Sequence, residues 1–98
     1  MNAPSPSAGA VTRVMKIVNE KGLHARASAK FVQLVEKYDA KVTVSRSGES
    51  AGGDSIMGLM MLAAGIGTSI EVSATGPQAV DVVDALDALV SGRFGEEE

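Results

Sequence analysis

The sequence predicts an α+β fold in which an antiparallel sheet is covered by helices on one face. Strand-like and helix-like segments follow one another in the order β-α-β-β-α-β-α, with short connections and no internal repeat. Two successive strands joined by a glycine turn favour a hairpin, and a hairpin requires antiparallel pairing. Helices placed between such strands bury their apolar stripes against the sheet. At 98 residues the chain has room for one small domain.

The first strand and the first helix are expected early in the chain. Residues 11–18 (VTRVMKIV) are rich in β-branched and apolar side chains, a composition typical of a strand. A helix is expected from Ala25 onward, because apolar residues recur there at the spacing of one helical face. These residues are Ala27, Phe31, Leu34, Val35 and Tyr38.

A strand pair and a second helix follow. Alternation of apolar and polar side chains over residues 40–47 predicts a half-buried strand. Gly48 predicts a turn into a short return strand over residues 49–51. The stretch GGDSIMGLMML then restarts a helix, for which Asp54 or Ser55 is the expected N-cap.

The last strand and the last helix complete the predicted domain. The second helix ends at Gly65 and Gly67, and alternation over residues 68–75 predicts the fourth strand. Gly76 and Pro77 open the last helix, since proline is tolerated in a first helical turn. Its expected buried stripe consists of Val80 or Ala79, Val83, Leu86 and Val90.

These elements define a domain over residues 11–91, flanked by a disordered leader at residues 1–10 and an acidic tail at residues 92–98. The leader has neither the basic start nor the apolar stretch of a signal peptide. The longest apolar run, residues 56–67, is shorter than the roughly 20 residues that span a bilayer. We therefore expect a monomeric cytoplasmic protein without membrane insertion.

Composition excludes several classes of function. Cysteine is absent, which rules out disulfides, zinc–thiolate sites and thiol catalysis. A net charge of −3, no basic cluster and few aromatic residues disfavour the alternative of a small nucleic-acid-binding domain. Asp81, Asp84 and Asp87 recur every three residues, which fits the solvated face of the last helix better than a metal site. We expect no metal and no cofactor.

The one histidine of the chain, His24, stands where the first helix is expected to begin. Helix N-caps are usually Ser, Thr, Asp or Asn, so a histidine there is unusual. The free N–H groups of Ala25, Arg26 and Ala27 meet the positive end of the helix dipole and form an anion site beside the ring. The guanidinium of Arg26 suits phosphate oxygens. A hydrogen-bonded structural imidazole is the plainer alternative.

This setting favours a phosphoryl carrier over a hydrolytic enzyme. A helix N-terminus disfavours the imidazolium, so the ring of His24 tends to stay neutral and nucleophilic. A phosphate formed on it would lie against the helix N–H groups and Arg26. In the sequence the only carboxylate near His24 is that of Glu20, and a second histidine is absent. The site can accept and pass on a phosphoryl group but is too sparse to run hydrolysis.

The segment KGLHARASAKFV resembles the active-site segment of HPr, the histidine-containing phosphocarrier family of the bacterial phosphoenolpyruvate-dependent phosphotransferase system. The resemblance covers residues 11–90. It implies an open-faced β-sandwich, in which a four-stranded antiparallel sheet carries three helices on one side. It also implies that phosphorylated enzyme I phosphorylates His24 on Nδ1, that an EIIA-type domain receives the group, and that Arg26 stabilises the phosphate. The branch served, sugar uptake or a nitrogen-related regulatory relay, stays open.

Two positions depart from the family pattern. Ala27 stands where proline usually follows the arginine, which removes some preorganisation of the first turn. Lys21 replaces the common asparagine before Gly-Leu-His, which removes a side-chain hydrogen bond and adds a positive charge. We expect altered rates at most.

The second helix carries more apolar residues than one buried face requires. Leu59 and Leu62 are expected in the core, and Ile56, Met57 and Met60 are expected on the surface. Exposed methionines suit docking to several partners in turn, and the resemblance implies a docking surface at these positions. The alternative is that all are core residues, with methionine filling gaps.

Ser55 has a structural and a regulatory interpretation. It can serve as the N-cap of the second helix. The resemblance implies a regulatory phosphorylation site for HPr kinase/phosphorylase, where a phosphoserine would add about −2 charge beside the docking residues. The alternative function is therefore a non-catalytic regulatory module that acts through Ser55 and the methionine-rich helix.

Overall fold

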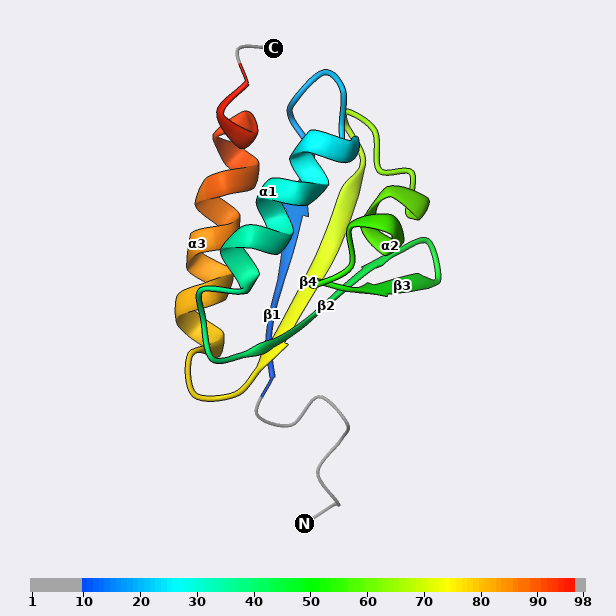
Figure 1. The fold of residues 1–98 in the computed structure, drawn as a ribbon. Helices are drawn as coiled ribbons and strands as arrows, with labels where there is room; N and C mark the ends of the chain where they lie inside the picture. Colours follow the sequence, from blue (N-terminus) through cyan, green and yellow to red (C-terminus); the bar gives the residue numbers. More distant parts are fainter. Residues whose placement is uncertain (1–9, 97–98) are drawn as a thin grey trace.

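The computed structural model describes residues 10–96 (Figure 1). Apart from Ala10, the predicted leader lies outside the described residues, as do residues 97–98 of the predicted tail. The elements follow the predicted order, with one short 3-10 helix (η1) added at the end. They are β1 (Val11–Lys16), α1 (Ala25–Val35), β2 (Lys41–Arg46), β3 (Glu49–Gly52), α2 (Ile56–Met61), β4 (Ser69–Thr75), α3 (Ala79–Ser91) and η1 (Arg93–Gly95).

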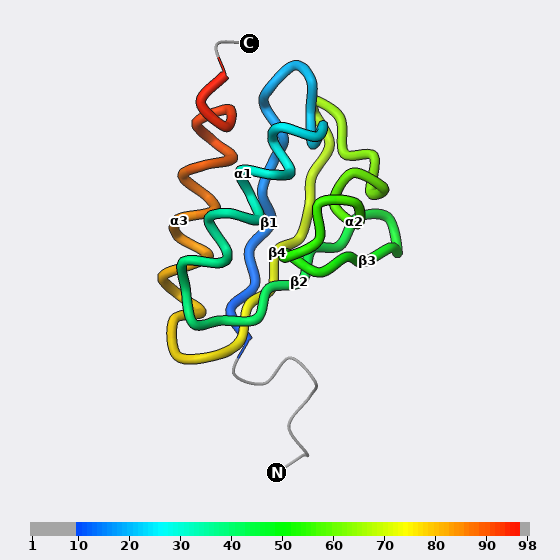
Figure 2. The backbone as a smooth tube through the Cα atoms, in the orientation of Figure 1, coloured from blue at the N-terminus to red at the C-terminus, as the bar shows by residue number. Residues whose placement is uncertain are grey.

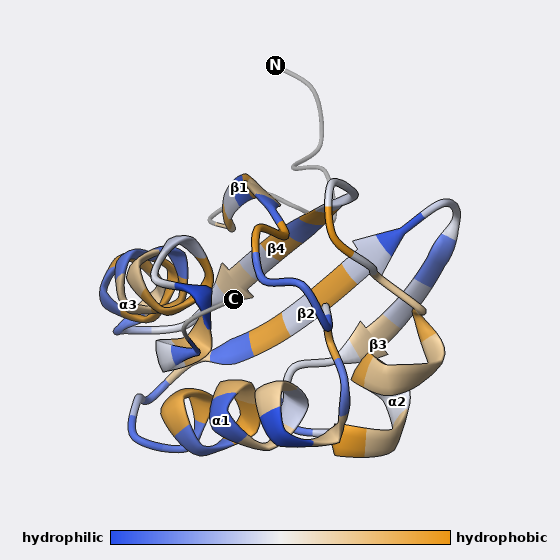
Figure 3. Cartoon of the chain, turned by 90° about the horizontal axis from the view of Figure 1, so that it is seen from above, coloured by the Kyte–Doolittle hydropathy of each residue, from blue (hydrophilic) through white to orange (hydrophobic). Residues whose placement is uncertain are grey.

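The four strands form one antiparallel sheet in the order β1-β4-β2-β3. The last strand in the chain, β4, therefore lies in the interior of the sheet, paired with β1 on one side and β2 on the other. The three helices cover one face, and the opposite face is open (Figure 3). The predicted α+β open-faced sandwich is confirmed.

The core lies between the sheet and the helices. Strands β2 and β4 alternate as predicted, so that Val44 and Val72 are buried while Glu71 faces solvent. From α1, Phe31 fills the centre of the core. On α3 the sequence left Val80 or Ala79 open, and the structure buries Ala79 and leaves Val80 56% exposed. The remaining predicted stripe residues of α3, Val83, Leu86 and Val90, are buried.

Helix α2 ends earlier than the sequence predicts. It stops at Met61, and Ala63 then adopts a left-handed backbone with φ of 53°. The reason is a contact outside the helix, because the Ala64 carbonyl accepts a hydrogen bond from the Leu23 N–H at 3.0 Å. The segment after α2 must leave the helix to reach the β1–α1 loop, and the two run side by side at one end of the molecule (Figure 2).

The packed part of the chain continues to Glu96, beyond residue 91 where the predicted domain ends. After α3 the chain turns through η1, and the Phe94 side chain is completely buried in the core. The Lys30 Nζ on α1 donates to the Phe94 carbonyl at 2.6 Å. A single aromatic residue among glycines and acids has no periodicity, so the sequence pattern could not place it.

The acidic stripe of α3 faces β1. Arg13 contacts Asp84 at 2.9 Å and Asp87 at 3.2 Å, on the solvated side of the helix. The hydrogen bond to Asp84 raises the pKa of the Arg13 guanidinium above its ordinary value, and the Asp87 carboxylate reinforces this against desolvation. Within residues 10–96 no three acidic or histidine side chains are grouped to hold a metal ion. Over the same residues, no helix has the length and hydrophobicity needed to cross a membrane.

Candidate functional site

The β1–α1 loop presents His24 and is fastened to the segment that follows α2. Gly22 makes this possible, because its φ of +66° is a left-handed conformation that favours glycine. A Cβ at Gly22 would also lie 2.4 Å from the Ala64 carbonyl oxygen. The neighbouring hydrogen bond from Leu23 to Ala64 holds the loop in this place. Only glycine fits here without moving the backbone.

His24 is the N-cap of α1, as predicted. Its backbone is extended and its side chain makes no capping hydrogen bond, so the ring is available for other contacts. The first intrahelical bond runs from the Ser28 N–H to the His24 carbonyl at 2.8 Å. The N–H groups of Ala25, Arg26 and Ala27 therefore precede the helical ladder and point beyond the helix end. The helix start can bind an anion next to the ring.

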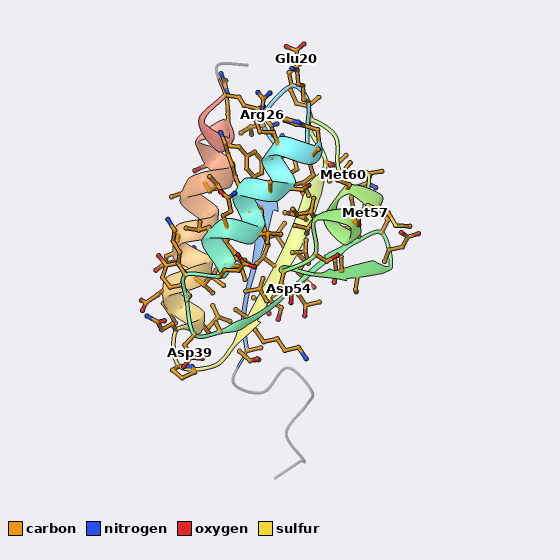
Figure 4. The ribbon with its side chains drawn as sticks, in the orientation of Figure 1. Glu20, Arg26, Asp39, Asp54, Met57 and Met60 are labelled. Atoms are coloured by element: carbon orange, nitrogen blue, oxygen red, sulfur yellow. The ribbon has the colours of Figure 1, made fainter. Side chains whose placement is uncertain are left out.

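Arg26 adds an exposed positive charge to this end of α1. Its side chain is exposed at the start of the helix (Figure 4). Among residues 10–96 no hydrogen bond or ion pair engages its guanidinium. It can therefore turn toward a phosphate on the ring without first breaking another contact. Ala27, in contrast, is fully buried, so this departure from the family pattern faces the core.

A carboxylate that the sequence did not place, that of Glu96, lies against the ring. Its Oε2 is 2.5 Å from His24 Nε2, and its Oε1 accepts a hydrogen bond from Asn19 Nδ2 at 3.0 Å. The expectation that Glu20 is the only nearby carboxylate is wrong. Glu20 lies exposed at the outer tip of the β1–α1 loop (Figure 4). The reason for the miss is distance along the chain, since 72 residues separate His24 from Glu96.

The Glu96 carboxylate is ionised at neutral pH. Burial raises its pKa, but hydrogen bonds from His24 and Asn19 and the charge of Lys21 outweigh that effect. The net result is a pKa below the ordinary value of 4.5. Lys21 replaces the family's asparagine, and its positive charge contributes to the electrostatics of the Glu96 carboxylate.

An apolar surface borders the histidine. We call the exposed side chains of Ile56, Met57 and Met60 the methionine patch; they are 40%, 71% and 39% exposed. Leu59 and Leu62 are buried, so the predicted division of this helix is confirmed. Figure 4 shows Met57 and Met60 on the outer side of α2. A shallow depression lined by residues including His24 and Met60 connects the ring with the patch.

Ser55 caps α2, which decides between the two predicted N-caps. Its Oγ accepts a hydrogen bond from the Gly58 N–H at 3.0 Å, and the side chain stays partly exposed beside the methionine patch. Asp54 is exposed and takes no part in the cap. The hydroxyl is thus both a structural group and an accessible one.

The fold and the site define a class of protein: a small open-faced β-sandwich that presents one histidine and an anion-binding helix start at one end. A family model described as "PTS HPr component phosphorylation site" matches residues 11–92. The phosphocarrier protein HPr of Cupriavidus necator is 50% identical over 82 residues, 84% of this chain and 92% of the relative.

Solved structures agree with this match. The crystal structure of HPr-C-His from Thermoanaerobacter tengcongensis superposes with a TM-score of 0.85 at 34% identity, covering 90% of this chain and 99% of that one. Crh of Bacillus subtilis, described as a catabolite repression protein with a domain-swapped dimer, gives 0.69 at 34% identity, covering 76% and 85%. The chain belongs to the HPr family of the phosphotransferase system, and the predicted phosphocarrier function is confirmed at the level of the family.

Proposed function

We propose that His24 carries the phosphoryl group, accepting it on Nδ1 from phosphorylated enzyme I and passing it to an EIIA-type domain. One observation supports this most directly: the ring is 25% exposed at the start of α1, beside the N–H groups of Ala25 and Ala27. The guanidinium of Arg26, which has no ion pair or hydrogen bond among residues 10–96, belongs to the same helix start. A nucleophile, an anion site and an exposed cation share the start of one helix.

No other side chain of this protein reacts in the transfer. The Nδ1 lone pair forms the N–P bond while the bond between phosphorus and the donor atom of enzyme I breaks, and that electron pair stays with the donor. The phosphate charge is then stabilised by the helix N–H groups and by Arg26. The sequence of events reverses when the acceptor takes the group. A carrier of this kind is consumed and regenerated stoichiometrically and needs no cofactor.

Intact-mass analysis after mixing with enzyme I and phosphoenolpyruvate tests the proposal. We expect one acid-labile phosphoryl adduct on the native chain and none on His24→Ala. An Arg26→Ala variant keeps the nucleophile and loses the guanidinium, so its adduct should form more slowly. An adduct of equal size and rate on His24→Ala would contradict the assignment.

We further propose that the methionine patch docks these partners in turn. It adjoins His24 through the shallow depression, so a partner seated on Ile56, Met57 and Met60 would face the ring. Met57→Asp should weaken binding to enzyme I, with Val80→Asp on α3 as a control away from the patch, since Val80 is also exposed. Equal binding by both variants and the native chain would argue against the patch.

A second candidate function is a regulatory module that acts through phosphorylation of Ser55 by a kinase of the HPr kinase/phosphorylase type. The accessible Ser55 hydroxyl beside the methionine patch favours it, as does the similarity to Crh, whose description refers to catabolite repression. Ser55→Asp should weaken docking without unfolding the protein. The regulatory function would survive His24→Ala, whereas the carrier function would not.

The acceptor domain, the oligomeric state and the cellular location can each be tested. A competition assay with EIIA-type domains of the sugar-uptake and nitrogen-related branches would identify the acceptor. We also propose that the carrier is monomeric, and light scattering would reveal a dimer like that of Crh. Phosphoenolpyruvate is an intracellular metabolite, which supports a cytoplasmic location that cell fractionation can check.

A further inference from the structure

We infer that Glu96 is a positioning residue for His24: it holds the ring proton on Nε2 and so keeps Nδ1 free as the nucleophile. The inference rests on the proposed function for its purpose, but the placement of the proton can be measured without any transfer. It concerns the contact between His24 and Glu96, which are 72 residues apart in the sequence. Glu96 is the last residue that the structure describes.

The contact itself assigns the donor and the acceptor. An ionised carboxylate only accepts hydrogen bonds, so across the 2.5 Å between Glu96 Oε2 and His24 Nε2 the ring nitrogen must be the donor. A neutral imidazole carries one N–H, and a proton fixed on Nε2 leaves a lone pair on Nδ1. In nucleophilic sites, a third group that orients a histidine selects its tautomer in the same way.

Asn19 holds the carboxylate in place. Its side chain is fully buried, and Nδ2 donates both to Glu96 Oε1 at 3.0 Å and to the Gly22 carbonyl at 2.9 Å. Both partners are acceptors, so the amide nitrogen must face them. Its oxygen, Oδ1, is buried without a hydrogen-bond partner among residues 10–96. Burying an unpaired amide oxygen costs free energy, so this orientation is maintained by the two bonds of Nδ2.

The segment that carries Glu96 is anchored independently of the site. Phe94 is buried in the core, Lys30 on α1 binds its carbonyl, and the Glu96 N–H bonds to the Arg93 carbonyl at 2.9 Å. The carboxylate is therefore fixed relative to the same helix whose start presents the histidine. A rigid support of this kind is what an orienting partner needs, since a loosely held group cannot restrict a ring.

The arrangement serves both directions of transfer. When Nδ1 forms the N–P bond, the ring becomes cationic and keeps its proton on Nε2, next to the Glu96 carboxylate. When the acceptor takes the group, the N–P bond breaks and its electron pair returns to Nδ1. No proton has to leave or enter the ring in either step. The carboxylate lies at the ring nitrogen opposite the phosphate, so the two anions are kept apart.

Nitrogen NMR of the imidazole tests the inference on the unphosphorylated protein. At about pH 8.5, where imidazoles are neutral, native His24 should show the Nε2–H tautomer. Glu96→Gln keeps the shape but can donate as well as accept, so the tautomers should mix. The rate of phosphorylation by enzyme I should fall about tenfold, the lower end of what losing the hydrogen-bond partner of a metal-bound histidine costs.

Glu20→Gln is the matched control, because it also removes one negative charge, from the exposed tip of the β1–α1 loop that presents His24. It should change neither the tautomer nor the rate appreciably. A native ring protonated on Nδ1, or a tautomer and rate unchanged in Glu96→Gln, would overturn the inference. If the native chain forms no adduct at all, the proposed function fails, and the tautomer measurement still decides the role of Glu96.

Discussion

The two helix starts near the site, that of α1 at His24 and that of α2 at Ser55, are built in opposite ways. Ser55 caps its helix with a hydrogen bond to the Gly58 N–H, whereas the His24 side chain gives its helix no cap. Helix α1 buries five of its residues, and α2 buries only Leu59. A well-packed helix can leave its N-terminus open for binding, while a short and poorly packed one needs its cap.

The largest effect should come from removing the packing that holds α1. Phe31→Ala empties the centre of the core, and we expect a loss of about 3–5 kcal/mol in the free energy of unfolding. Urea unfolding measures it, with the exposed Gln33→Ala as control on the same helix. A loss below about 1 kcal/mol, typical of a surface position, would show that α1 does not depend on its packing.

Gly22→Ala should distort the β1–α1 loop that leads to the start of α1. We expect a cost of about 1–3 kcal/mol from the left-handed backbone alone, plus the displacement of Ala64 by the new Cβ. Gly48→Ala is the matched control, because Gly48 also has a positive φ, of +83°, but nothing lies within 4 Å of its Cβ position. Thermal unfolding and the phosphorylation rate should both suffer more at position 22. Equal effects at the two positions would show that the close contact between Gly22 and Ala64 does not matter.

Ser55→Ala tests the cap of α2. Loss of the hydrogen bond to Gly58 should cost about 1 kcal/mol. Asp54→Ala, which removes the other cap that the sequence allowed, should be nearly neutral. Chemical denaturation of the two variants side by side measures the difference, and the reverse order would assign the cap to Asp54.

His24→Ser would give α1 the kind of cap that α2 has. The new cap adds about 1 kcal/mol, and loss of the contact with Glu96 acts against it, so the net change should stay within about 0.5 kcal/mol. Phosphoryl acceptance should vanish while stability hardly moves. A variant that unfolds readily would mean that the imidazole has a structural role after all.

The smallest effect is on the pH dependence of stability, and it arises from Glu96 at the start of α1. The folded pKa of Glu96 lies below its ordinary value of 4.5, so the unfolded chain binds this proton more readily. The contribution of Glu96 to stability is therefore complete above about pH 4.5 and is lost as the pH falls through the lower pKa of the folded state. Melting temperatures of Glu96→Gln should decline less steeply than native ones in this acid range. Parallel curves would contradict the linkage.

Local pattern predicted most of this molecule. The strands, the helix stripes, and the placement of His24 and Arg26 all follow from signals within a few residues of one another. The early end of α2 could not be predicted, because it depends on the contact of Ala64 with the β1–α1 loop. Phe94 and Glu96 were missed for the same reason, since a single buried aromatic and an acid in an acidic run show their roles only once the chain has folded.

The position of Glu96 has a practical consequence for anyone who handles this protein. An affinity tag or a fluorophore attached next to Glu96 would lie beside the contact with the histidine, and should shift rates without harming the fold. The first strand begins at the opposite end of the domain from that contact (Figure 1). Fusions placed ahead of Val11 therefore leave the reactive end untouched, and kinetic comparisons among laboratories should use that attachment.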